Sequence, residues 1–266
     1  MSLGECGLKE RFIYGTLATA VFITLLLFGS YIFAGGILIM AIIGYVEFVR
    51  IYGLKLTFVA PWLGVLGLIS IVVPWNDYDL HFLNFETTLW LLLLLLMGLT
   101  VLTKNRIKLA ELAPLFLGVV YIGFGFHYMI EVRALGLFWA LLVFTTIWGS
   151  DIGAYLFGGW FGKRKLWPKI SPNKTWEGAI GGVATSLVIA FVFVLIDSEQ
   201  LSWSMAIQIG IVASVLGQIG DLIQSAYKRS AGVKDAGNLI PGHGGILDRC
   251  DSWIIVFPFI YYFILT

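Results

Sequence analysis

The stretch Thr88-Leu-Trp-Leu-Leu-Leu-Leu-Leu-Leu-Met-Gly-Leu-Thr-Val-Leu102 decides the class of fold, because it contains no charged residue. Such a run lacks the period-2 alternation of a half-buried strand and predicts a helix in apolar surroundings. The 266-residue chain has the same character throughout, since 59% of its residues are hydrophobic and only 12% are charged. A soluble domain typically carries about a quarter charged residues. The composition excludes a soluble domain and a disordered chain, and it predicts an all-α polytopic integral membrane protein.

Apolar runs recur along the chain at the length that a bilayer requires. A transmembrane helix needs about 20 mostly apolar residues, with a range of roughly 17–25. We therefore expect about nine transmembrane helices. The runs are Phe12–Phe28, Tyr31–Val49, Thr57–Val73, Thr88–Leu102, Leu112–Ile130, Leu135–Phe157, Gly178–Ile196, Trp203–Gln224 and Ser252–Leu265. We divide them into residues 1–110, with helices one to four, and residues 111–266, with helices five to nine and the polar motifs.

The positive charges of the loops predict the orientation of these helices. With nine spans, the N-terminus and every second loop share one side of the membrane, and of the 17 Lys and Arg residues only Arg133 falls on the other side. By the positive-inside rule the basic side is cytoplasmic. We expect the plasma (inner) membrane of a prokaryote, with the N-terminus inside and the functional site on the cytoplasmic side.

Five carboxylates gather near the cytoplasmic ends of the last four predicted spans. Asp151 and Asp221 lie inside spans, where an ionisable group costs at least a few kcal/mol and is a functional-site candidate by default. A structural ion pair with a loop Lys is the alternative for both. Glu177, Asp248 and Asp251 open spans, where they could simply complement a helix N-terminus. The N-terminal half is chemically quiet by comparison, with few ionisable groups beyond Glu47.

Two basic cytoplasmic segments, residues 162–178 and 225–251, accompany the carboxylates. Carboxylates beside basic loops suit a polyanion held through Mg²⁺, which usually binds one or two carboxylates together with substrate phosphates. Glycines such as Gly244 and Gly245 let backbone N–H groups approach phosphate oxygens. The three histidines have no metal-ligand spacing, which disfavours zinc. Basic residues beside a bilayer commonly only meet anionic headgroups, and we interpret Lys104 and its basic neighbours in that way.

Two pairs of glycines lie four residues apart on the predicted spans. They are Gly149 with Gly153, and Gly178 with Gly182. Small residues at this spacing let helix backbones approach closely inside a membrane. We therefore predict helix packing at these positions rather than a ligand site.

The 225–251 segment resembles the signature of the phosphatidate cytidylyltransferases, also called CDP-diacylglycerol synthases. The family pattern is Ser-x-aliphatic-Lys-Arg, four residues, Lys-Asp-x-small, then His-Gly-Gly and finally Asp-Arg-x-Asp. Two positions depart from it: Tyr227 stands where an aliphatic residue is usual, and Cys250 where an aliphatic residue or Thr is usual. With family-like motifs at 150–155 and 171–178, the resemblance covers about residues 148–251. The matching residues are Ser225, Lys228, Arg229, Lys234, Asp235, Gly237, His243, Gly244, Gly245, Asp248, Arg249 and Asp251.

The resemblance implies that CTP and phosphatidate react to give CDP-diacylglycerol and pyrophosphate. The lipid phosphate is already anionic near pH 7, so it needs placement and charge neutralisation rather than a strong base. Mg²⁺ and a second cation could supply both. We expect Asp221 and Asp248 to be the metal-bridging pair, with Asp251 and Asp151 nearby. The other expected catalytic residues are Lys228, Arg229, Lys234 and His243. The expected substrate-binding residues are Ser171, Asn173, Lys174, Asp235, Gly244, Gly245 and Arg249.

Two other functions stay open beside this one. A CTP-dependent lipid kinase would use similar metals, and only the signature favours cytidylyl transfer over it. A membrane transporter would place polar groups at the bilayer midplane, on broken helices in paired halves. The expected partners are CTP, phosphatidate and the lipid bilayer, and a homodimer stays open. No basic run with interleaved aromatic residues supports nucleic-acid binding.

Overall fold

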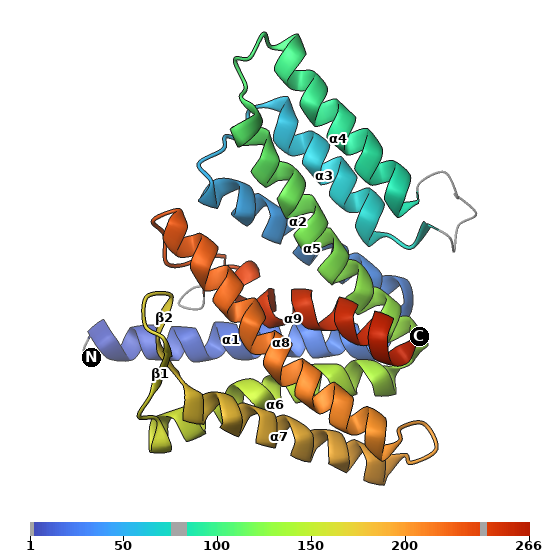
Figure 1. Cartoon of the computed structure of the whole chain (residues 1–266), viewed down its shortest axis with the longest axis vertical. Coiled ribbons are helices and arrows are strands. Elements are labelled where there is room, and N and C mark those ends of the chain that lie inside the picture. The colour runs from blue at the N-terminus through green and yellow to red at the C-terminus, as the bar shows by residue number, and fades with distance from the viewer. Residues whose placement is uncertain (1–2, 76–83, 240–243) are drawn as a thin grey trace. The chain divides into compact units, whose positions relative to one another are not determined.

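The computed structural model describes residues 3–75, 84–239 and 244–266 (Figure 1). These residues form nine α-helices, one β-hairpin and a terminal π-helical turn at Tyr261–Leu265. The prediction of an all-α class is confirmed, with the hairpin as the exception. The helices are α1 (Leu3–Phe28), α2 (Ser30–Ile51), α3 (Val59–Val72), α4 (Phe85–Leu102), α5 (Leu109–Leu135), α6 (Leu137–Phe161), α7 (Trp176–Ile196), α8 (Trp203–Ser230) and α9 (Leu247–Ile260).

Six helices in the described part of the chain are long and apolar enough to cross a bilayer, namely α2 and α4 to α8. The apolar parts of α1 and α3, at Ile13–Phe28 and Val59–Val72, are shorter than a full span. Helix α9 has 14 residues. The class of a helical membrane protein is therefore confirmed, whereas the expected count of nine spans is not.

Helix α8 extends beyond the predicted end at Gln224 and continues to Ser230. The expectation that Ser225, Lys228 and Arg229 lie in a loop is wrong, because all three lie in the last turns of this helix. A helix C-terminus carries partial negative charge, which stabilises Lys and Arg there. Helix α9 likewise begins at Leu247 rather than at the predicted Ser252.

A β-hairpin lies between α6 and α7, in a segment that we expected to be a loop. Strand β1 (Lys165–Trp167) pairs antiparallel with β2 (Ser171–Thr175), with an irregularity in the register. In Figure 1 the hairpin lies where α6 ends and α7 begins. Thr175 caps α7, because its side chain accepts a 3.1 Å hydrogen bond from the N–H of Gly178. The turn between two spans is thus an ordered element.

The chain forms two compact units. The first comprises Met1–Glu131 and Asp235–Arg249, and the second comprises Val132–Lys234 and Cys250–Thr266. The 235–249 segment therefore packs with the N-terminal helices, although in sequence it follows α6, α7 and α8 of the second unit. The predicted division into residues 1–110 and 111–266 was drawn from the order of the membrane helices, and it stays a prediction.

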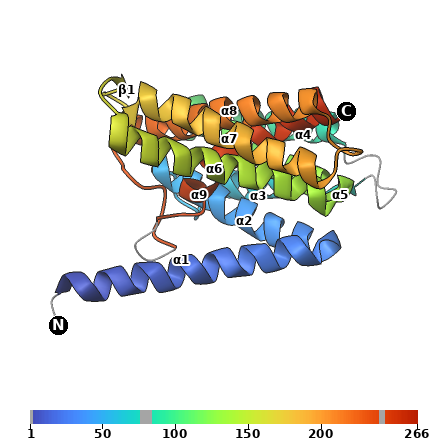
Figure 2. The same ribbon diagram turned by 90° about the horizontal axis from the view of Figure 1, so that it is seen from below.

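The second unit is built on close contact between α6, α7 and α8, which lie side by side in Figure 2. A Cβ at Gly153 would be 2.8 Å from a carbonyl oxygen of α7. A Cβ at Gly182 would be 2.9 Å from a carbonyl oxygen of α6, and one at Gly178 would be equally crowded. Gly149 faces the side chain of Ile189. The prediction that these glycines serve helix packing is confirmed.

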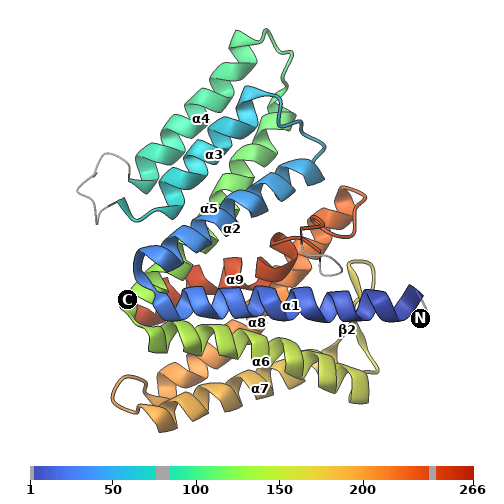
Figure 3. The same ribbon diagram turned by 180° about the vertical axis from the view of Figure 1, so that it is seen from behind.

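The first unit packs α2 against α3 and α5, with α4 on the other side of α3 (Figure 3). Tyr45 of α2 is fully buried and fills the space that Gly64 of α3 and Gly118 of α5 leave open. Two residues further along the same helix, Glu47 is only 4% exposed. A buried carboxylate is costly unless hydrogen bonds compensate for the lost water, so this position calls for partners.

Candidate functional site

Three carboxylates from three helices of the second unit lie within electrostatic reach of one another. Asp221 of α8 interacts with Asp151 of α6 and with Asp251 of α9, and the last two also interact with each other. Like charges repel, so their gathering in apolar helices favours a nearby positive charge. The structure thus brings together three of the four carboxylates that we expected around a metal.

Lys174 of β2 supplies one positive charge to this cluster. Its Nζ lies 2.7 Å from Oδ2 of Asp221, and it is also within electrostatic reach of Asp151. Ser225 donates a 3.2 Å hydrogen bond to Oδ1 of Asp221. The ion pair that we weighed as the structural alternative for Asp221 is therefore present. Its side chains are 22% and 36% exposed, so the pair is partly buried.

Lys228 supplies a second positive charge from the last turn of α8. It is only 8% exposed and interacts with Asp251. A buried ammonium group needs such a partner, because the interior offers little solvation. Its neighbour Arg229 is exposed and donates a 3.0 Å hydrogen bond to the carbonyl oxygen of Val233. The two residues of the predicted Lys-Arg pair therefore differ in burial. Lys228 is buried and offsets the charge of Asp251, whereas Arg229 is exposed.

The hairpin presents further predicted substrate-binding residues. Ser171 and Asn173 lie on β2 with Lys174. The carboxylate of Glu177, in the first turn of α7, accepts hydrogen bonds from the N–H groups of Lys163 and Arg164 at 3.2–3.3 Å. Glu177 thereby ties the start of the hairpin to the start of α7, which explains its place without a role in chemistry.

Asp248 organises the 235–249 segment of the first unit. Its Oδ2 accepts hydrogen bonds from the N–H groups of Ala236, at 2.8 Å, and Gly245, at 2.9 Å. Gly244 has φ of +85°, a conformation that favours glycine. One oxygen of Asp248 thus links Ala236 and Gly245 to the first turn of α9.

Glu47 is the residue that the sequence analysis missed. Its Oε1 accepts a hydrogen bond from the N–H of Ile246, and its Oε2 accepts one from Leu247, both at 3.0 Å. The two donors lie at the start of α9, where N–H groups lack partners within the helix. The available signal was a lone carboxylate near the end of an apolar helix.

The remaining predicted residues lie at exposed positions or outside the described residues. Lys234 is the last residue of one stretch of the second unit and Asp235 the first residue of a stretch of the first, and both are exposed, as is Arg249. His243 lies outside the described residues. The expected metal-bridging pair joins Asp221 of the second unit with Asp248 of the first, so this pairing stays a prediction.

No group of three or more His, Cys, Asp or Glu side chains within the described ranges is arranged to hold a metal ion on its own. Mg²⁺ typically needs only one or two carboxylates when substrate phosphates supply further ligands. The carboxylates of the second unit fit that smaller requirement in chemistry and charge. They do not form a closed cage made of protein alone.

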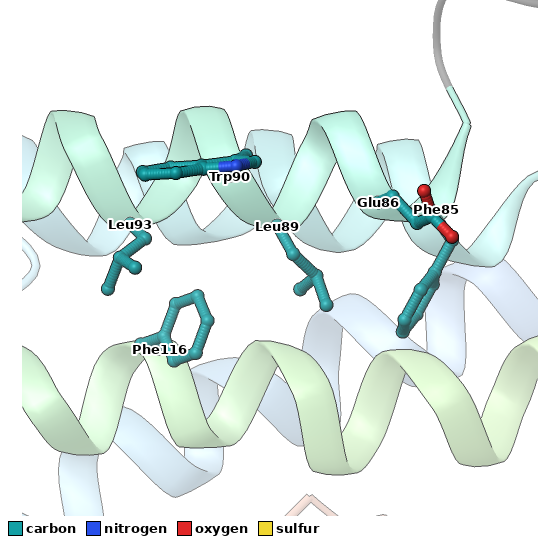
Figure 4. Close-up of a pocket in the computed structure, with 6 residues that line it drawn as sticks. All are labelled: Phe85, Glu86, Leu89, Trp90, Leu93 and Phe116. Carbon is teal, nitrogen blue, oxygen red and sulfur yellow. The ribbon is translucent and has the colours of Figure 1, made fainter.

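A shallow hollow between α4 and α5 of the first unit is a different kind of surface (Figure 4). Phe116 of α5 points toward Leu89 and Leu93 of α4. The hollow is lined by Phe85, Glu86, Leu89, Trp90, Leu93 and Phe116. Its wall has one carboxylate, five largely apolar side chains and no Lys or Arg, so it does not suit a polyanion.

The chain matches the family model described as "Cytidylyltransferase family" over residues 9–266. It is 40% identical over 260 residues to a protein of Bacillus subtilis (strain 168) named phosphatidate cytidylyltransferase, covering 96% of this chain and 97% of that one. A Staphylococcus saprophyticus protein of the same name is 37% identical over 257 residues, covering 94% and 96% of the two chains. One from Staphylococcus aureus (strain COL) is 37% identical over 251 residues, again covering 94% and 96%.

Proposed function

The chain belongs to the cytidylyltransferase family, and we propose that it is the enzyme that joins CTP and phosphatidate to give CDP-diacylglycerol and pyrophosphate. The observation that carries this proposal is the similarity, over nearly the whole chain, to bacterial proteins named for that activity. The cluster of three carboxylates with Lys174 and Lys228 agrees with it, because a triphosphate needs both cationic side chains and a means of neutralising its charge.

The proposed chemistry is a single displacement at phosphorus. An oxygen of the phosphatidate phosphate forms a bond to the α-phosphorus of CTP, while the bond from that phosphorus to the oxygen bridging the β-phosphorus breaks. The electron pair of the broken bond leaves with pyrophosphate. The attacking oxygen is already anionic near pH 7, so the protein places the two phosphates in line and neutralises charge.

We propose Mg²⁺ as the cofactor of this site, and a second cation stays open. Asp221 is the first candidate ligand, because it interacts with the other two carboxylates of the second unit and its two oxygens contact Lys174 and Ser225. Asp248 is the candidate ligand from the first unit. When bound, the ion supplies charge neutralisation on the triphosphate. Lys174 is the candidate for a phosphate partner, since its ammonium group lies beside Asp221 and is partly exposed.

Detection of the product tests the proposed function. The purified protein in nanodiscs, supplied with CTP and phosphatidate, is expected to form CDP-diacylglycerol and pyrophosphate, both followed by mass spectrometry. A lipid kinase would instead release CDP and transfer the γ-phosphoryl group to a lipid hydroxyl. A transporter would leave CTP and phosphatidate unchanged, so either of these outcomes contradicts the proposal.

We also propose an orientation in the membrane. The apolar helices and bacterial relatives support an integral membrane protein of a prokaryote. From the Lys and Arg distribution we expect residue 104 to face the cytoplasm and the C-terminus to face outside. In a cysteine-free background, an impermeant thiol reagent applied to intact cells should label Thr266→Cys and spare Lys104→Cys. The reverse pattern would mean that the orientation is inverted.

A further inference from the structure

We propose that Glu47 is a positioning residue, which reaches from α2 to the 235–249 segment and holds Asp248 in its orientation. This proposal deepens the proposed function and rests on it for its kinetic consequences. Its structural part, the order of the segment, stands on contacts within the first unit alone. Sequence gives no sign of the link, because the bonded residues are 199 and 200 positions apart.

The hydrogen bonds of Glu47 are complete and specific. Each carboxylate oxygen accepts one backbone N–H, from Ile246 and from Leu247, at 3.0 Å. The Glu47 side chain is only 4% exposed, so the two N–H groups have no ready access to water as an alternative acceptor. A carboxylate with two equivalent oxygens is the one common side chain that satisfies two adjacent N–H donors in this manner.

The segment is shaped around the Glu47 carboxylate. A Cβ at Gly237 would be 2.6 Å from Oε1 of Glu47, and a Cβ at Gly245 would collide with both oxygens. Two separate parts of the segment therefore approach the same carboxylate, and only glycine permits this at either position. Gly244, with its positive φ, lies between the second contact and the undescribed residues.

Glu47 and Asp248 divide three consecutive N–H groups between them. The N–H of Gly245 donates to Asp248, and the next two, of Ile246 and Leu247, donate to Glu47. The two carboxylates also interact electrostatically, and Arg50 offsets part of that repulsion from the next turn of α2. The direction of the Asp248 side chain therefore depends on Glu47. Glu47 itself is enclosed by protein and acts through this segment.

The deciding experiment compares Glu47→Gln with Glu111→Gln in the purified full-length protein. Gln keeps one acceptor oxygen and turns an NH₂ group toward the other backbone donor. We expect amide exchange at residues 244–249, measured by hydrogen–deuterium exchange, to speed up about tenfold, the effect of one lost bond to a charged acceptor. Glu111 is exposed and bonds only to the nearby N–H of Lys108 among its described contacts, so its variant should exchange like the wild type.

Kinetics provide the second readout. We expect kcat/KM for CTP to fall about tenfold in Glu47→Gln, with a raised KM, because the segment that carries Asp248 and Arg249 is misplaced. A loss of folded protein alone would lower kcat without raising KM. Tyr45→Phe, a buried change on the same helix, measures that general effect.

If Glu47→Gln does not fold, Glu47→Asp replaces it in both measurements. Asp keeps the charge but is too short to reach both N–H donors.

The outcomes separate the two proposals. Wild-type exchange at residues 244–249 in the Glu47 variants, or an unchanged KM for CTP, would overturn the positioning role. If the wild-type protein forms no CDP-diacylglycerol, the proposed function fails, while the exchange comparison still decides whether Glu47 orders the segment.

Discussion

Asp221→Asn is expected to lower the rate of CDP-diacylglycerol formation by about 100-fold or more, equivalent to about 2.7 kcal/mol of barrier. Asp221 interacts with Asp151 and Asp251 and lies in direct contact with Lys174, so removing its charge alters the surroundings of all three groups. Asn is nearly isosteric and can keep hydrogen bonds to Lys174 and Ser225. The protein should fold normally while losing attraction for a cation, and steady-state turnover at saturating CTP measures the loss.

A matched control for this prediction is Lys104→Gln. Lys104 is exposed in the turn between α4 and α5, and we interpret its charge as serving orientation. Its substitution should change turnover by less than a few fold. Raising the Mg²⁺ concentration should restore part of the activity of Asp221→Asn, because the defect lies partly in metal affinity. Folded Asp221→Asn protein with near-normal turnover would remove Asp221 from the mechanism.

Asp248→Asn is expected to cost a similar factor, about 100-fold or more. The side-chain oxygen of Asn can still accept the N–H groups of Ala236 and Gly245, so the fold of the segment should persist while the negative charge is lost. A large loss of turnover with unchanged hydrogen exchange at residues 244–249 would assign Asp248 to the chemistry.

Asp248→Ala separates the two roles of this residue. It removes the acceptor as well as the charge, so we expect the same loss of turnover together with faster exchange at residues 244–249. If Asp248→Asn retains activity and only Asp248→Ala loses it, Asp248 serves the fold of the segment rather than the binding of a cation. Comparison of both variants by exchange and turnover therefore tests the charge and the hydrogen bonds independently.

The sequence predicted the features that depend on composition and on local spacing. The apolar runs predicted a helical membrane protein, and the glycine pairs at 149/153 and 178/182 predicted helix contacts that the structure contains. The gathering of Asp151, Asp221 and Asp251 followed from their common depth at the ends of predicted spans. Depth is a property that hydropathy reveals, so carboxylates at one depth on packed helices were expected to meet.

Other features depend on tertiary contacts that no local pattern encodes. The β-hairpin was missed because Ser171-Pro-Asn-Lys-Thr175 has only one β-branched residue and a Pro, which argue against a strand. The end of α8 was misplaced because its last turns are polar, and polarity marks the end of a span rather than the end of a helix. Glu47 appeared to be an isolated carboxylate, since its partners Ile246 and Leu247 lie about 200 residues away.

That separation has a consequence for the synthesis of the protein. Translation proceeds at about 5–20 residues per second, so roughly 10–40 s pass between the emergence of Glu47 and that of its two N–H donors. During this interval α2 carries a carboxylate whose final partners do not yet exist, while the helices of the second unit are being made. The contacts of Glu47 therefore form late in synthesis, after helices α1 to α8 have been made, and they complete the first unit.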